Sequence, residues 1–182
     1  MIMTASSSLQ KLLYYSPQSV FLLRSLNLDI PVRKVQEQLR EHDRLWMIDG
    51  NRCKTAKGIF CEFQSKMFLP DCGNWDGFVD WLSDMSWVNP VGKDEIRMNQ
   101  SHFVFISNAR RLNELNDKDR RIFFEIIANL QRDQWNPPWR ENRSDRVFRF
   151  VLACADADYA IVNGMLTDAN VSYVELNGLS QE

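Results

Sequence analysis

Residues 73–85 read GNWDGFVDWLSDM, and this stretch places three acidic residues at steps of four: Asp76, Asp80 and Asp84. At 3.6 residues per turn, this spacing puts the three carboxylates on one side of a helix. The other side carries an apolar stripe that can bury against a core: Trp75, Phe78, Val79, Leu82 and Met85. Asn74 is a favourable N-cap residue, and Gly73 interrupts the chain before it. We therefore predict a short surface helix over residues 74–85 that shows a face of carboxylates to solvent.

The acidic face of this helix costs stability. Like charges four residues apart in a helix repel by about a few tenths of a kcal/mol per pair, and Asp is a poor helix former. Only Asp76, in the first turn, gains from the helix dipole. A solvated helix usually mixes Glu, Lys and Arg, whereas this one has Asp and no cation. Two interpretations stay open on these residues alone: a face kept for a partner that needs negative charge, and an ordinary solvated face.

Length and composition are those of a folded domain. The 182 residues are enough for one domain with a core, and 45% hydrophobic residues exclude a disordered chain. The net charge of −2 gives no overall reason for binding nucleic acid or an anionic membrane. The charge is unevenly spread, however, because residues 71–95 contain six acids and one base. The sequence thus predicts a local acidic patch on a nearly neutral protein.

The cysteines and the N-terminus also bear on the class of protein. Cys53, Cys61, Cys72 and Cys154 form no CxxC pair and have no histidine nearby, which argues against zinc. The N-terminal residues lack a basic region, and the apolar run at residues 20–23 is too short for a signal or a membrane span. We expect a cytoplasmic protein with reduced thiols, no cofactor and no metal.

The chain before residue 44 is predicted to be helical. Residues 6–15 and 19–26 are short apolar runs separated by a proline, and a second proline opens a helix over residues 32–42. We therefore expect residues 1–43 to form an N-terminal helical extension.

Beyond residue 43, strands and helices alternate. Four runs are predicted as strands: residues 44–48, 102–107, 146–154 and 171–176. Four segments between them are predicted as helices: residues 55–67, 74–85, 118–131 and 156–167. Because the connections between strands contain helices, the strands are expected to pair in parallel in an α/β fold.

Residues 44 to about 154 resemble the barstar family, whose founding member is the intracellular inhibitor of the ribonuclease barnase. The likeness rests on a strand that ends in Ile48-Asp49-Gly50, the following Leu69-Pro70 loop, and a helix that reads Trp75-Asp76-x-x-x-Asp80-Trp81-Leu82. Further support comes from a helix with residues at steps of four, Ile59, Phe63 and Met67, and from Trp87 after the acidic helix. The resemblance covers about 110 of the 182 residues.

The resemblance implies a fold. We expect a barstar-like domain over residues 44–155, with a parallel sheet of three strands packed with helices. Residues 156–182 are expected to pack onto it as a C-terminal αβ extension within a single domain. This extension is predicted to add a fourth parallel strand that covers a sheet edge.

The resemblance also implies a function. In this family, the loop and the acidic helix plug the nuclease active site, and two aspartates four residues apart stand in for RNA phosphates; Asp76 and Asp80 match them. The chain is thus expected to be a ribonuclease inhibitor or immunity protein, monomeric when free, whose partner is a ribonuclease or another nuclease toxin. The candidate partner-binding residues are Cys72, Gly73, Asn74, Asp76, Val79, Asp80 and Asp84.

The chain departs from the family pattern at the contact surface. The family loop carries tyrosines where Cys72 stands, and it is about two residues longer. A tryptophan of the family helix is Val79 here, and the acidic residue on the helix before the last strand falls near Asn129. The connector at residues 88–101 is longer than in the family. The acidic pair therefore carries over, whereas the aromatic contacts do not.

Several candidates also have structural interpretations. Asn74 is expected to act first as a cap, Gly73 to meet a backbone requirement, Trp75 to join the core and Cys72 to serve as a small apolar filler. Asp84 lies near the helix end. Outside this helix, the arginines of residues 140–149 are interpreted as a solvated strand edge rather than an RNA contact, and Trp135 and Trp139 as packing residues.

Two other functions stay open. An adaptor could keep this fold and bind an unrelated partner, as the altered loop suggests. An enzyme could hold Mg²⁺ with the aspartate row, because hard cations prefer carboxylate oxygens, and use it in phosphoryl transfer. The sequence shows no glycine-rich phosphate loop and no nucleophile–base motif, which disfavours the enzyme.

Overall fold

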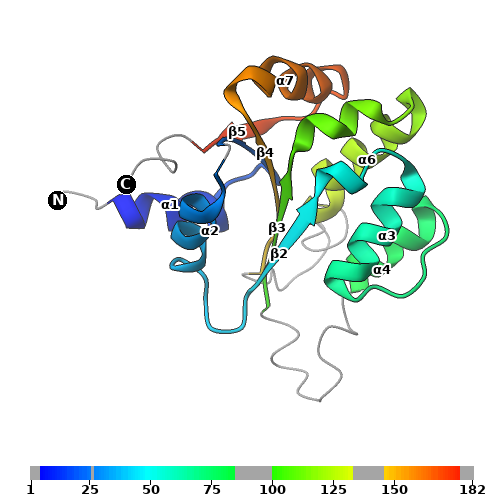
Figure 1. The fold of residues 1–182 in the computed structure, drawn as a ribbon. Coiled ribbons are helices and arrows are strands. Elements are labelled where there is room, and N and C mark those ends of the chain that lie inside the picture. Colours follow the sequence, from blue (N-terminus) through cyan, green and yellow to red (C-terminus); the bar gives the residue numbers. More distant parts are fainter. Residues whose placement is uncertain (1–4, 26, 85–99, 133–145, 177–182) are drawn as a thin grey trace.

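The structure, a computed structural model, describes residues 5–25, 27–84, 100–132 and 146–176. Five parallel strands form one sheet in the order β2-β3-β4-β1-β5 (Figure 1). The strands are β1 Val20–Arg24, β2 Arg44–Asp49, β3 His102–Ser107, β4 Phe148–Cys154 and β5 Tyr173–Glu175. The predicted α/β class with a parallel sheet is confirmed, but the sheet has five strands rather than three or four.

Helices cover both faces of the sheet. They are α1 Ala5–Tyr15, α2 Asp29–Gln36, α3 Ala56–Met67, α4 Trp75–Asp84, α6 Asp117–Leu130 and α7 Tyr159–Asp168, with short 3₁₀ turns η1 Gly50–Arg52, η3 Ala109–Glu114 and η5 Asp156–Asp158. Alternate strand residues point to opposite faces. Val104 and Ile106 of β3 pack in a core with α3, α4, α6 and α7, whereas Phe103 and Phe105 pack in a second core with α1 and α2. Figure 1 shows the two groups of helices on opposite sides of the strands.

The helical prediction for residues 19–26 is wrong, because Val20–Arg24 is strand β1. This strand lies inside the sheet, where Val20 pairs with Phe150 of β4 on one side and with Tyr173 of β5 on the other. Its four apolar residues are buried on both faces, as is typical of an interior parallel strand. A run of four apolar residues has no periodicity that separates such a strand from a buried helix. The C-terminal strand β5 is parallel, as predicted, but it pairs with β1.

The other predicted elements are confirmed with small shifts at their ends. The helix predicted over residues 32–42 is shorter and begins earlier, as α2. Thr55 caps α3, since its hydroxyl accepts a hydrogen bond from the Gly58 amide at 3.0 Å. The division of the chain at residues 43 and 155 stays a prediction. Residues 85–99 and 133–145, which include Trp87, Trp135 and Trp139, lie outside the described residues, as does most of the predicted connector.

The N-terminal helix α1 is joined to the sheet by a buried arginine of β4, Arg149, so the prediction of a solvated strand edge is wrong for this residue. The Arg149 side chain donates hydrogen bonds to the carbonyl oxygens of Leu13 (Nε, 2.8 Å) and Ser16 (Nη2, 2.9 Å) at the end of α1. A cation at a helix C-terminus also interacts favourably with the helix dipole. Burial lowers the pKa of the Arg149 guanidinium to about 10. The segment before residue 44 is thus held by a sheet residue as well as by strand pairing.

Candidate functional site

The start of α4 is built as the sequence predicts. The Asn74 Oδ1 atom accepts a hydrogen bond from the Gly77 amide at 2.8 Å, so the predicted cap is confirmed. Gly73, before the cap, has a φ of +50°, in the left-handed region that favours glycine. No atom lies within 4 Å of a Cβ added at Gly73, so the backbone conformation, not the space, selects glycine here.

A second glycine brings the preceding loop against α4. A Cβ added at Gly77 would lie 2.6 Å from the carbonyl oxygen of Cys72, which no real side chain tolerates. The Cys72 side chain belongs to the core, and burial raises the pKa of its thiol. This agrees with its interpretation as an apolar filler, and it leaves little Cys72 surface for a partner.

Aromatic packing fixes the buried side of α4. Phe78 is fully buried and meets Phe63 of α3 edge-on, with ring centroids 5.1 Å apart. Trp75 packs against the core, as predicted, with its ring 4.9 Å from that of Phe60. Because these rings interlock in edge-to-face geometry, rotation of the helix about its axis would break several contacts at once.

A hydrogen bond between side chains joins α4 to α6. The Trp75 indole Nε1 donates to Asp119 Oδ1 at 2.8 Å. Asp119 is itself held in the first turn of α6, since the Asn116 side chain accepts from its amide and donates to its Oδ2. The pattern Asn116-x-x-Asp119 marks a helix start in the sequence, but nothing local reveals that Asp119 reaches Trp75.

The acidic face of α4 is open. Asp76 and Asp80 are both exposed, and neither forms an ion pair with another described residue. Val79 lies between them in the sequence and is half-buried. Asp84 is the last residue of α4, but its side chain is outside the described part of the structure. Two of the three predicted carboxylates are thus available to a partner.

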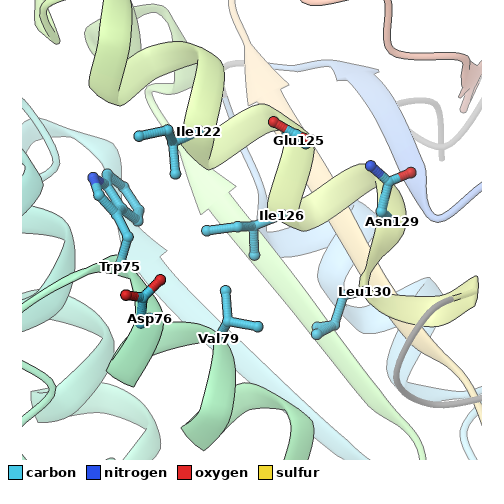
Figure 2. A pocket seen from close by; sticks show the side chains of 8 residues that line it. All are labelled: Trp75, Asp76, Val79, Ile122, Glu125, Ile126, Asn129 and Leu130. Atoms are coloured by element: carbon cyan, nitrogen blue, oxygen red, sulfur yellow. The ribbon is translucent and has the colours of Figure 1, made fainter.

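A groove lies beside this face, between α4 and α6. It has a volume of about 260 Å³. Its lining residues are Trp75, Asp76 and Val79 from α4, and Ile122, Glu125, Ile126, Asn129 and Leu130 from α6. Figure 2 shows Asp76 and Val79 directed from α4 toward α6, with Ile126 directed toward α4 from the facing helix.

The groove also contains residues of α6 that were not among the predicted contact residues. Asn129 lines the groove; it is the residue near which the family pattern has an acidic side chain. Glu125 lies one helical turn before Asn129 and also lines it, so an acidic side chain of α6 is present after all. The spacing of four residues between Glu125 and Asn129 predicts that both lie on the same side of α6. It does not predict that this side faces α4, because that depends on tertiary packing.

Other classes of site are not seen in the part of the chain that the structure describes. No group of three or more His, Cys, Asp or Glu side chains there is placed to hold a metal ion. None of the described helices has the length and apolar character needed to cross a membrane.

The fold and this face define an α/β domain that presents an acidic helix beside an apolar groove. The family model described as Barstar (barnase inhibitor) matches residues 44–153, more than half of the chain. The chain belongs to the barstar family. A comparison with curated proteins found no match. The matched segment spans β2, β3 and β4 with α3, α4 and α6, so β1 and β5 lie outside the matched residues.

Proposed function

We propose that the protein inhibits a ribonuclease by inserting the acidic face of α4 and the loop at residues 69–73 into the nuclease active site. The observation that carries this proposal is the pair Asp76 and Asp80, exposed and without an ion-pair partner among the described residues, on a helix that an aromatic cluster holds in place. The proposal is supported by membership of the barstar family, because the matching family model is described as a barnase inhibitor.

The proposed mechanism is occlusion rather than chemistry. Ribonucleases hold Arg, Lys and His side chains that point at phosphate oxygens. Carboxylates can take the place of those oxygens and form charge-assisted hydrogen bonds with the same cations. Because α4 is fixed before binding, little conformational entropy is lost when the carboxylates engage. RNA is then excluded, and the inhibitor itself catalyses no reaction.

The acidic patch is also suited to fast association. Opposite charges on the inhibitor and on the nuclease cleft raise the association rate, and salt screens this attraction. A protein of this kind would act in the cytoplasm as a monomer. There it would serve as an immunity protein that protects its own cell from a ribonuclease toxin.

The test begins with capture of the nuclease from the native host and measurement of its affinity for aspartate variants. Asp80→Ala is expected to weaken binding by about 3 kcal/mol or more, because a nuclease cation stays buried without its partner. Asp76→Ala should cost somewhat less. Asp168→Ala, which removes an exposed carboxylate at the end of α7, is the matched control and should bind normally.

The free energy of unfolding of each variant shows whether weaker binding comes from a lost contact with the nuclease or from a destabilised fold. Asp80→Ala should leave the free energy of unfolding unchanged or slightly higher, since it relieves repulsion between like charges. If both α4 variants inhibit the nuclease and protect cells as well as the unsubstituted protein does, the acidic-plug mechanism is wrong.

An adaptor function is the second candidate, favoured by the burial of Cys72 in the loop before α4, at the position where the resemblance places tyrosines. Capture of a partner without nuclease activity, with affinity insensitive to Asp80→Ala, would support the adaptor. The Mg²⁺ enzyme makes a different prediction, namely calorimetric binding of about one Mg²⁺ per chain that is lost in Asp76→Ala.

A further inference from the structure

The outer edge of β2 carries two residues whose backbone groups point away from the sheet. The Arg44 amide donates to the carbonyl oxygen of Ser101, just before β3, at 2.9 Å, so every second residue from Arg44 onward turns its backbone groups toward β3. Leu45 and Met47 therefore turn theirs outward, because β2 is the first strand of the sheet (Figure 1). Among the described residues, the backbone amides and carbonyl oxygens of Leu45 and Met47 have no hydrogen-bond partner.

Hydrogen bonds within the chain limit this open stretch at both ends. The next outward amide, that of Asp49, donates to the buried carboxylate of Glu62 at 3.0 Å. The Asp43 amide, just before β2, donates to the carbonyl oxygen of Arg40 at 3.0 Å. The carbonyl oxygens of Asp43 and Asp49 also accept hydrogen bonds from side chains. The open groups are thus confined to two residues that lie two positions apart in one strand.

The side chains along the open stretch are apolar. Met47 is 39% exposed, and Leu45 is partly buried against the core beside α1 and α2. These two side chains share one face of the sheet, because they are two residues apart in a strand. Trp46 points to the other face, where its indole bonds to His102 of β3 and its ring stacks on the imidazole. Trp46 thus leans over β3, which leaves the outer edge of β2 accessible to another strand.

We propose that this edge binds the same edge of a second copy of the chain, as an antiparallel pair that joins two five-stranded sheets. In antiparallel pairing, two opposite residues with outward backbone groups exchange both of their N–H···O bonds. When Leu45 lies opposite Met47 of the second copy, two-fold symmetry places Met47 opposite the second Leu45, and every open group finds a partner. A register that pairs Leu45 with Asp49 fails, because Glu62 already holds that amide.

The same register suits the side chains. It places the two Trp46 residues opposite each other and Leu45 beside Met47, so the cross-strand pairs are apolar or aromatic and no like charges meet at the centre. The paired stretch is short compared with the roughly 20–30 residues per side of a standard interface, so the dimer is weak. The free monomer expected from the sequence is therefore the dilute form, and it is the form that acts in the proposed function.

Sedimentation of the full-length protein tests for the dimer. As the concentration increases from about 5 µM to about 1 mM, mass action should raise the average mass from 21.4 kDa toward twice that value. Met47→Lys should abolish this increase, because the two lysines would lie diagonally across the pair and repel each other. Ile161→Lys is the matched control: it adds the same charge at an apolar residue of α7 that is 40% exposed, and it should dimerise normally.

Amide hydrogen exchange shows whether β2 is the surface involved. In the unsubstituted protein, exchange of the Leu45 and Met47 amides should slow several-fold between the low and the high concentration. Exchange of the Asp49 amide should not change, because Glu62 holds it in the monomer as well. This comparison needs no substitution, so it decides the question even if Met47→Lys does not fold.

Three results would overturn the proposal. The first is a mass of 21.4 kDa at every concentration. The second is a dimer that persists in folded Met47→Lys, and the third is a dimer that leaves exchange at Leu45 and Met47 unchanged, because in both cases the second copy binds elsewhere. A dimer that Met47→Lys removes, Ile161→Lys retains and the two amides report supports it, whether or not a ribonuclease is inhibited.

Discussion

The His102 side chain, at the start of β3, shows how one buried residue links pH to stability. Its Nδ1 accepts a hydrogen bond from the Trp46 indole at 3.0 Å, and its ring stacks against Phe148. Burial lowers the pKa of the imidazole to about 3, and the charges of Arg44 and Arg146 act in the same direction. The folded protein therefore holds a neutral imidazole whose Nδ1 is an acceptor, and protonation would remove that hydrogen bond.

This arrangement predicts a loss of stability in acid. In the unfolded chain His102 is protonated below about pH 6.5, whereas in the folded chain it is protonated only below about pH 3. Stability should therefore fall with decreasing pH across this window, by up to about 1.4 kcal/mol per pH unit from this residue. His102→Asn keeps an acceptor but cannot titrate, so its free energy of unfolding should depend less steeply on pH. Urea denaturation of both proteins from pH 7 to pH 4 measures the difference, and equal slopes would contradict the prediction.

At the scale of elements, α4 shows what local sequence can predict. Its cap, its apolar stripe and its acidic face all follow from residue spacing, because they depend on neighbours within one or two turns. Strand β1 could not be predicted in this way, since its four apolar residues have no period and its partners lie at residues 150–154 and 173–175. The groove was missed for the same reason, because it exists only where α6 faces α4.

The link between these two helices can be tested through the Trp75–Asp119 hydrogen bond. Trp75→Phe keeps an aromatic ring but removes the donor, so the free energy of unfolding should fall by about 1–2 kcal/mol. A double-mutant cycle with Asp119→Ala separates this bond from the hydrogen bond that the Asp119 carboxylate accepts from the N-cap residue Asn116. A coupling energy of at least about 0.5 kcal/mol is expected from urea denaturation of the four proteins. A coupling energy of zero would mean that the bond does not fix α4.

At the scale of the whole molecule, strand β1 from the N-terminal segment and strand β5 from the C-terminal segment extend the sheet beyond β4. The segment matched by the family model supplies β2, β3 and β4, and strand β1 then covers the free edge of β4. Strand β5 in turn covers β1, over only three residue pairs. The N-terminal segment is thus expected to contribute far more to the sheet than the C-terminal one, because it supplies an interior strand and two helices.

Two truncations test this unequal contribution. A fragment of residues 44–155 loses α7 and β5 and, in addition, β1, α1 and α2. The loss of β1, α1 and α2 exposes the edge of β4, the apolar side chains Phe103 and Phe105, and the Arg149 guanidinium, which donates to carbonyl oxygens at the end of α1. An open strand edge beside an apolar face is prone to self-association, so this fragment should aggregate or unfold well below the melting temperature of the full chain.

A fragment of residues 1–155 is the matched comparison, because it loses β5 and α7 but keeps β1 on the edge of β4. This fragment should remain soluble. Its melting temperature should be lower, because removal of α7 uncovers the part of the core that packs against Val162. Size-exclusion chromatography and thermal unfolding of the three proteins give the order of stability. If residues 44–155 alone are monomeric and as stable as the full chain, the family unit is an independent domain. In that case strand β1 is not needed for the stability of the family unit, and it does not help to hold α4 in place.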